Sequence, residues 1–347
     1  MKVERSQVLQ LSIYDTRVLK GVALFMLLCH HCLYTGNEYD DVVVFGYPLF
    51  KSFGVFCKLC VSIFVFLSGY GLTICALRNN GIGQPIRFYK RRYVKLMINY
   101  WLIWLIFVPV GVLCFERTFP EVYGDYYILK GIVDFFGLYN AVFYTPYGYN
   151  ATWWFYGCII VLYLLFPLIW YFRNYWFLMI PLALFMPVLG RIPIFGSSGA
   201  FGYLLPFICG MTFASEKLRC GGGGKIQWKI LLLFVFILIC GYRIRVSNPI
   251  MWDTVIIVWG VYLYKLFPAY SCISNSFAFF GKHSFNIFLF HTFIYAYYFH
   301  DYIYWSRNPI VIIATLLIAC IIISILLEWL KATLRINKLQ EKLLKQQ

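Results

Sequence analysis

Apolar segments about as long as a membrane is thick alternate with short polar segments along the whole chain. The runs 61–77 and 309–327, for example, contain no charged residue. At about 1.5 Å rise per residue, an α-helix of about 20 apolar residues spans the hydrocarbon layer of a bilayer. The pattern predicts ten membrane-spanning helices, at residues 18–35, 53–77, 94–114, 152–172, 175–190, 199–215, 228–243, 250–267, 277–299 and 309–328.

The distribution of positive charge predicts which side of the membrane each connection occupies. Lys and Arg concentrate in segments 78–95 and 217–229 and in the tail. With ten spans, these segments and the N-terminus fall on one side, and cytoplasmic loops carry the excess of Lys and Arg. We therefore expect an all-α integral membrane protein with both termini cytoplasmic. It has one polytopic domain, residues 1–330, and a basic cytoplasmic tail, residues 331–347.

Composition and net charge agree with this class of protein. Hydrophobic residues make up 62% of the chain and charged residues 13%, whereas soluble domains are about half apolar and about a quarter charged. The net charge of +16 would suggest a nucleic-acid partner in a soluble protein. Here the cations lie between apolar segments, which is the pattern of membrane topology. We expect a lipid bilayer and no nucleic acid as partner.

Few ionisable residues lie inside the predicted spans, and such residues are functional candidates because burying them in lipid is costly. Lys20 and His31 are eleven residues apart in the first span. At 3.6 residues per turn they share one helix face, about 16 Å apart along the axis, and His30 points about 80° to the side. His291 is a third histidine, in the ninth span. The cation of Lys20 could hold the anionic end of a cytoplasmic donor. The imidazole of His31, deeper in the membrane, would then meet the reactive end of that donor.

Two other interpretations of these residues compete with this one. In the first, Lys20 only anchors the end of the span, and the histidines are buried polar contacts between helices. In the second, the four consecutive Cys and His residues Cys29-His30-His31-Cys32 form a metal-binding site. Four consecutive residues of a helix point in four directions, however, and cannot meet at one tetrahedral ion. We predict no metal.

Five segments occur in an order that resembles a known family. They are Lys20 followed by His31, an aromatic-rich segment with Ser68-Gly69-Tyr70, Arg92-x-x-Lys95 ahead of Tyr100-Trp101, Trp153-Trp154-Phe155 leading to Tyr163 and Pro167, and Gly281-x-x-Ser284 continuing to His291. Each motif alone is weak, but the ordered set resembles the membrane acyltransferase type 3 family, whose members include polysaccharide O-acetyltransferases. Lysine stands at Lys20 and Lys95 where that family has arginine, which keeps the charge but loses the bidentate geometry toward phosphate.

The resemblance implies an acyltransferase that moves an acetyl group from cytoplasmic acetyl-CoA to a hydroxyl of a cell-surface glycan, such as a capsule, exopolysaccharide or O-antigen unit. A group of cations suits the phosphates of the co-substrate acetyl-CoA, namely Lys20, Arg91, Arg92 and Lys95. His31 is the expected catalytic residue, either as the base for the sugar hydroxyl or as the nucleophile that carries the acyl group. Supporting roles are expected for His30, His291, Ser284, Ser68 and Tyr70.

The acceptor side offers weaker candidates. Trp153 and Trp154 could stack on sugar rings, although external aromatic residues more often form the interfacial belt of a membrane protein. Arg243 and Asp253 lie at the external ends of neighbouring spans and could contact the glycan, although a local ion pair is the stronger interpretation.

Two other function classes compete with the enzyme. A transporter of a glycan lipid or an organic anion would have internal symmetry with broken spans in matching positions, which the sequence does not show. A sensory or scaffolding protein would need a cytoplasmic output domain, but the segment after Glu328 is a short basic amphipathic helix. We therefore expect a multi-pass acyltransferase of the bacterial cytoplasmic membrane.

Overall fold

The computed structural model describes residues 7–8, 10–35, 38–143, 148–189, 199–215, 219–220, 226–246, 250–267 and 271–345. Lys217 and Lys225, which contribute to a predicted cytoplasmic segment, lie outside these residues. The described α-helices are α1 (Ile13–His30), α2 (Leu49–Cys57), α3 (Leu59–Arg78), α4 (Pro85–Cys114), α5 (Phe119–Tyr123), α6 (Tyr127–Phe135), α7 (Tyr139–Val142), α8 (Trp154–Tyr171), α9 (Trp176–Leu189), α11 (Leu204–Ser215), α12 (Ile226–Arg243), α13 (Ile250–Leu266), α14 (Ser271–Thr292), α15 (His300–Tyr304), α16 (Pro309–Thr333) and α17 (Ile336–Lys345).

The predicted all-α membrane fold is confirmed. Among the described residues, five helical segments are long and apolar enough to cross a membrane: Ile13–Tyr34, Leu49–Arg78, Pro85–Cys114, Ala151–Tyr171 and Pro309–Thr333. Helices also occupy the other five predicted spans, namely α9, α11, α12, α13 and α14. The protein is a multi-pass membrane protein; ten spans and two cytoplasmic termini stay predictions.

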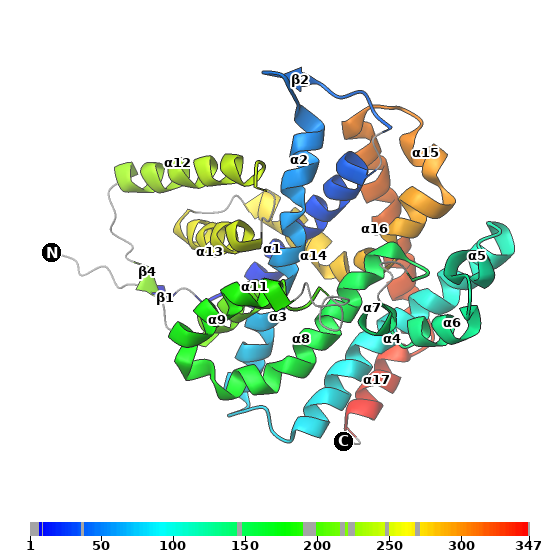
Figure 1. Cartoon of the computed structure of the whole chain (residues 1–347), viewed down its shortest axis with the longest axis horizontal. Helices are drawn as coiled ribbons and strands as arrows, with labels where there is room; N and C mark the ends of the chain where they lie inside the picture. The colour runs from blue at the N-terminus through cyan, green and yellow to red at the C-terminus, as the bar shows by residue number, and fades with distance from the viewer. Residues whose placement is uncertain are drawn as a thin grey trace.

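Strands are confined to two short antiparallel pairs in the described residues. β1 (Gln7–Val8) pairs with β4 (Arg219–Cys220), and β2 (Val43–Val44) pairs with β3 (Tyr47–Pro48). The first pair joins the N-terminal segment to the connection between α11 and α12 (Figure 1). These two segments therefore lie on the same side of the helices, as the charge distribution predicts.

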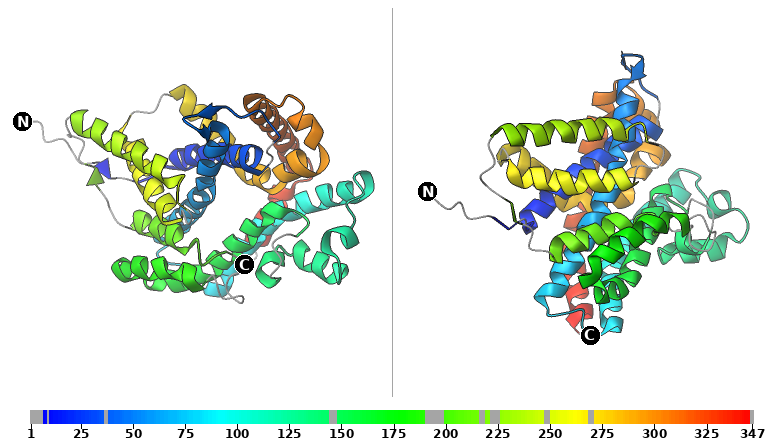
Figure 2. Two further views of the ribbon diagram at one scale, coloured as in Figure 1. Left: turned by 45° about the horizontal axis from the view of Figure 1, so that its top comes forward. Right: turned by 60° about the vertical axis from the view of Figure 1, so that its left-hand side comes forward.

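Helices α1, α3 and α14 form the centre of the molecule. Figures 1 and 2 show α12 and α13 on one side of this centre and α5 and α6 on the opposite side. Helix α1 packs along α14 and α3, and α3 packs along α11. The central helices carry many of the fully buried side chains, including Leu24, Leu28, Phe66 and Phe290.

Two glycines allow α1 and α14 to cross with their backbones in contact. A Cβ at Gly21 would lie inside contact distance of the Phe277 carbonyl oxygen, and one at Gly281 would overlap the Arg17 carbonyl oxygen. Small residues at such crossings let membrane helices approach closely, which increases van der Waals contact. The crossing fixes the relative position of all the side chains that these two helices carry.

The start of α1 is fixed separately. Ser12 caps the helix by accepting from the Asp15 backbone N–H, and the Asp15 carboxylate accepts from the Ser12 N–H, which forms a capping box. The same carboxylate accepts a hydrogen bond from Tyr264 and forms an ion pair with Lys265, both on α13. The cap therefore also anchors α1 to α13.

The segment between α4 and α8 packs around one buried carboxylate. Asp134 on α6 is 1% exposed and accepts hydrogen bonds from the Tyr123 hydroxyl at 2.6 Å and the Tyr149 backbone N–H at 2.8 Å. The Tyr100 hydroxyl of α4 lies 3.3 Å from the same carboxylate and 2.6 Å from the Asp134 carbonyl oxygen. Burial raises the pKa of Asp134 to about 6, although these hydrogen bonds oppose the shift.

Gly281→Ala tests the crossing. The added methyl group cannot fit without separating α1 from α14, so we expect the free energy of unfolding to fall by about 3 kcal/mol or more, the upper range for overpacking. Gly71→Ala in α3 is the matched control, because a Cβ there meets no atom within 4 Å. Thermal unfolding in detergent measures both variants. Equal unfolding temperatures for the two variants would show that the crossing does not limit stability.

Asp134→Asn tests the buried carboxylate. Because the pKa of Asp134 is raised on folding from 3.8 to about 6, the folded protein binds a proton that the unfolded chain lacks. Stability from this group is therefore gained as the pH falls and lost as it rises through about 6. Between pH 7 and pH 5 the wild type should gain about 1 kcal/mol relative to Asp134→Asn. Unfolding curves for the two proteins that keep a constant offset across this range would contradict the assignment.

Candidate functional site

The first histidine of the candidate site lies where α1 changes its winding. The helix is regular to His30 and continues as a π-helical segment, η1 (His31–Thr35). Short π-helical segments within α-helices occur frequently at functional sites. The His31 ring is 5.0 Å from the His291 ring and 5.5 Å from the Tyr295 ring, between ring centroids.

The second histidine comes from the crossing helix. His291 of α14 is fully buried, and its Nδ1 lies 3.0 Å from each of the carbonyl oxygens of Ile287 and Phe288. A second π-helical segment, η4 (Phe293–Tyr298), follows directly. It carries Tyr295, whose hydroxyl lies 3.1 Å from the His31 Nδ1. The two π-helical segments thus place His31 and Tyr295 in contact with each other and with His291.

His30 is held differently from its neighbour. Its Nδ1 lies 2.8 Å from the Gly54 carbonyl oxygen of α2, and its ring stacks on Tyr34 with centroids 5.3 Å apart. The His30 and His31 rings still meet edge to face, with centroids 5.2 Å apart. The predicted divergence of the two adjacent histidines therefore holds: His31 contacts α14, and His30 joins α1 to α2.

A cavity of about 270 Å³ brings together four of the predicted site residues. Lys20, Ser68, Lys95 and Ser284 line it, from α1, α3, α4 and α14 respectively, and Lys20 is exposed within it. Phe288 of α14 also lines this cavity, one turn before His291. We call it the lysine cavity. Its two ammonium groups face a space otherwise bounded mainly by aromatic and aliphatic side chains.

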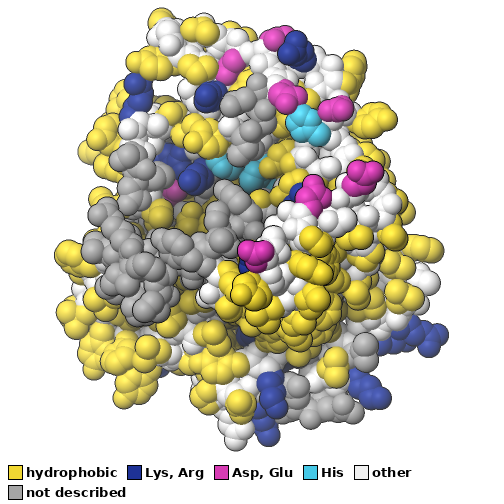
Figure 3. Space-filling view, turned by 45° about the vertical axis from the view of Figure 1, so that its right-hand side comes forward, with side chains coloured by type: hydrophobic (Ala, Val, Ile, Leu, Met, Phe, Trp, Pro, Cys, Tyr) yellow, Lys and Arg dark blue, Asp and Glu magenta, His cyan; other side chains and the backbone are white. Residues whose placement is uncertain are grey.

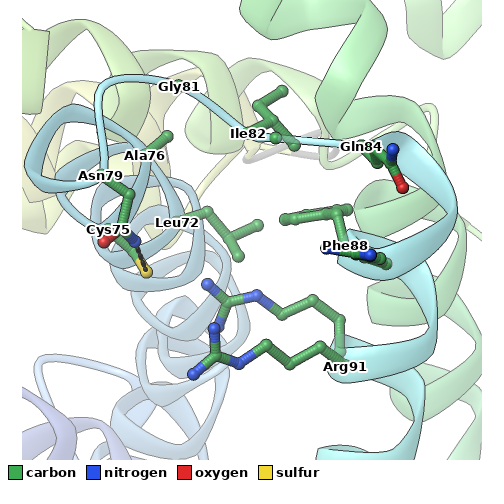
Figure 4. A pocket seen from close by; sticks show the side chains of 12 residues that line it. Leu72, Cys75, Ala76, Asn79, Gly81, Ile82, Gln84, Phe88 and Arg91 are labelled. Atoms are coloured by element: carbon green, nitrogen blue, oxygen red, sulfur yellow. Dashed lines mark hydrogen bonds between the residues drawn. The ribbon is translucent and has the colours of Figure 1, made fainter. Parts of the chain in front are cut away.

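Arginines line a second cavity, of about 290 Å³, at the connection between α3 and α4. Arg87, Arg91 and Arg92 contribute to its wall, opposite Leu72 and Cys75 of α3. Figure 4 shows Arg91 extending from α4 across this space toward α3. We call it the arginine cavity. No acidic side chain is among the described residues that line it.

A third cavity, also of about 270 Å³, adjoins each of the first two. It shares Arg92 with the arginine cavity and shares Leu96 and Tyr163 with the lysine cavity. The three cavities therefore follow one another along α4, from the arginines to the two lysines. The histidine pair follows along α14, because Phe288, which lines the lysine cavity, precedes His291 by three residues.

One face of the molecule is hollowed. Figure 3 shows histidine side chains at the bottom of this hollow, with basic and acidic side chains beside them. His31 is partly exposed, whereas His30 and His291 are buried. Of these three histidines, His31 is therefore the one that a reacting molecule could reach from outside.

The predicted acceptor residues have structural contacts. Arg243 and Asp253 are both buried and form a two-point ion pair, which a hydrogen bond from Ser62 extends to α3. The Trp153 indole donates to the Leu289 carbonyl oxygen at 2.8 Å. These contacts join helices, which supports the local ion pair as the better interpretation of Arg243 and Asp253.

Two further predicted residues also have structural contacts. The Tyr70 hydroxyl bonds the backbone N–H and carbonyl of Leu11, and so holds the segment before α1. The Trp154 ring lies 5.9 Å from the Tyr203 ring.

The sequence interpretation did not select Tyr295, Arg87 or Asn99. Tyr295 contacts His31 directly, Arg87 lines the arginine cavity and Asn99 lines the lysine cavity. Spacing could have identified two of them. Tyr295 follows His291 by four residues and Asn99 follows Lys95 by four residues, so each pair shares a helix face.

Comparison with known proteins identifies the family. The profile of the acyltransferase domain family matches residues 13–329, nearly the whole chain. The chain belongs to this family, and the predicted relationship is confirmed. No curated protein and no solved structure matches the chain significantly.

Proposed function

We propose that this membrane acyltransferase transfers an acetyl group from cytoplasmic acetyl-CoA to a hydroxyl of a cell-surface glycan. The single observation that carries the proposal is the contact of His31 with His291 next to a cavity lined by Lys20 and Lys95. A cationic site suits the donor, and a histidine pair suits the acyl transfer. The acceptor class follows from the resemblance to polysaccharide O-acetyltransferases.

The arginine cavity is the proposed site for the phosphates of CoA. Arg87, Arg91 and Arg92 together provide planar donors that match phosphate oxygens. From there the pantetheine arm can follow the cavities along α4 to Lys20 and Lys95. Eleven residues of α1 separate Lys20 from His31, about 16 Å along a helix, so the thioester would lie beyond the lysines.

His31 is the proposed catalytic residue. As a base, it removes the proton of the acceptor hydroxyl while the oxygen attacks the thioester carbonyl, and the CoA thiolate leaves with the proton. As a nucleophile, it takes the acyl group from CoA and passes it to the hydroxyl in a second step. Ser68 and Ser284 are proposed to support the donor in the lysine cavity.

The partly exposed side of His31 is the proposed acceptor side. A glycan hydroxyl reaching His31 from this face would meet a donor that approaches through the cavities along α4. This arrangement suits an enzyme of the bacterial cytoplasmic membrane, with its donor inside the cell and its product outside.

His31→Ala compared with His30→Ala tests the enzyme. With purified protein in nanodiscs and acetyl-labelled acetyl-CoA, we expect His31→Ala to slow thioester cleavage about 10²–10⁴-fold, the usual contribution of a catalytic base. His30→Ala should retain activity within about tenfold, because its ring bonds the Gly54 carbonyl oxygen. Donor binding, measured by calorimetry, should be unchanged in both variants. Full activity of His31→Ala, or no acetyl-CoA binding by the wild type, would remove the basis of the proposal.

Arg91→Gln tests the donor path. Losing one charge-assisted bond to phosphate should weaken acetyl-CoA binding about tenfold or more, corresponding to about 1.5–3 kcal/mol. The KM for acetyl-CoA should rise while kcat changes little. Lys282→Gln is the control, because this exposed cation of α14 is not among the residues that line the described cavities. Equal KM values for the two variants would place the phosphates elsewhere.

A further inference from the structure

One nitrogen of the histidine pair has an unusual environment. His291 is 0% exposed, and its Nε2 has no hydrogen-bond partner within the described part of the chain. Leaving a buried polar atom unpaired costs about 1–3 kcal/mol. An unpaired buried atom within a catalytic site is therefore a candidate for contact with a reacting group.

The hydrogen bonds on the other side of the ring define the chemistry of this nitrogen. The Nδ1 of His291 contacts two carbonyl oxygens, those of Ile287 and Phe288, at 3.0 Å each. Carbonyl oxygens only accept, so Nδ1 must carry the proton. In the neutral ring Nε2 then has a free lone pair. Because both bonds are made to its own helix, the backbone of α14 holds this tautomer in place.

The surroundings show where the lone pair is available. The His291 ring lies 5.0 Å from the His31 ring and stacks on Tyr295 at 6.0 Å, between centroids. Tyr295 in turn has its hydroxyl 3.1 Å from the His31 Nδ1. The hydrogen bond of Tyr295 is therefore made to His31, and the Nε2 of His291 lies on the ring edge away from its own helix.

We propose that the two histidines divide the reaction, an inference that rests on the proposed acyl transfer. His31 receives the acyl group, and the Nε2 of His291 is the base that deprotonates the acceptor hydroxyl. His291 is thus a second catalytic residue with a fixed tautomer. Tyr295 is a positioning residue that orients His31 through its Nδ1.

The two half-reactions balance. In the first, a nitrogen of His31 attacks the thioester carbonyl, the carbon–sulfur bond breaks, and the CoA thiolate leaves with the proton that His31 gives up. In the second, Nε2 of His291 takes the proton of the acceptor hydroxyl while its oxygen attacks the acyl carbon. The carbon–nitrogen bond to His31 then breaks, and the proton on His291 returns to His31. Both histidines end neutral.

His291→Asn separates the two steps. The asparagine amide keeps a donor near the carbonyl oxygens of Ile287 and Phe288 but has no counterpart of Nε2. With acetyl-labelled acetyl-CoA and water as the acceptor, wild-type protein should release CoA continuously. His291→Asn should release about one equivalent per protein and then slow about 10²–10⁴-fold, the contribution of a general base. The label should remain on His31, located by mass spectrometry of the digested protein.

Two controls keep the outcomes distinct. His31→Ala should show neither the burst nor the label. Tyr295→Phe removes only a hydroxyl and should slow continuous CoA release without a burst, because it acts on His31. Steady CoA release by His291→Asn within about threefold of the wild type would overturn the division of roles. The absence of a burst would overturn it too, provided that His291→Asn is monodisperse and binds acetyl-CoA. If His291→Asn does not fold, CoA release by Tyr295→Phe at the wild-type rate overturns the proposal. A wild type that cleaves no thioester contradicts the proposed function instead.

Discussion

The backbone contact between α1 and α14 is the constraint on which the candidate site depends. Gly21 and Gly281 occupy the point where a side chain would collide with the facing helix. Because this contact fixes the positions of both helices, it also fixes the distance between the histidines that they carry. The two π-helical segments, η1 and η4, then turn His31 and Tyr295 toward each other. One crossing thus assembles a site from residues more than 250 positions apart in the chain.

The site combines cavities of different chemistry in a fixed order. Arginines line the first cavity and two lysines the last, before the histidine pair. The number of cationic side chains therefore falls toward the histidine pair, and the number of aromatic side chains rises. This order suits a donor with phosphates at one end and an uncharged thioester at the other, because each part of the molecule meets groups of matching polarity.

Periodicity and charge in the sequence predicted the parts of the structure that single helices determine. The helical class, the shared face of Lys20 and His31 and the divergence of His30 follow from helix geometry alone. The ordered motifs also identified the family. The spacing of Tyr295 from His291 placed it on the same helix face, but its contact with His31 depends on the crossing of two helices. Asp134 has partners from three separate segments. Such contacts depend on tertiary packing, which a pattern along one helix does not encode.

An experimental structure with a non-hydrolysable acetyl-CoA analogue bound would test the central claim most directly. That claim is that the crossing of α1 and α14 places the histidine pair at the end of the donor path. The account predicts phosphates beside Arg87, Arg91 and Arg92, the arm of the analogue passing Lys20 and Lys95, and its acyl end against His31. The account would be contradicted if the acyl end of the bound analogue were remote from His31. It would also be contradicted if α1 and α14 did not meet at Gly21 and Gly281.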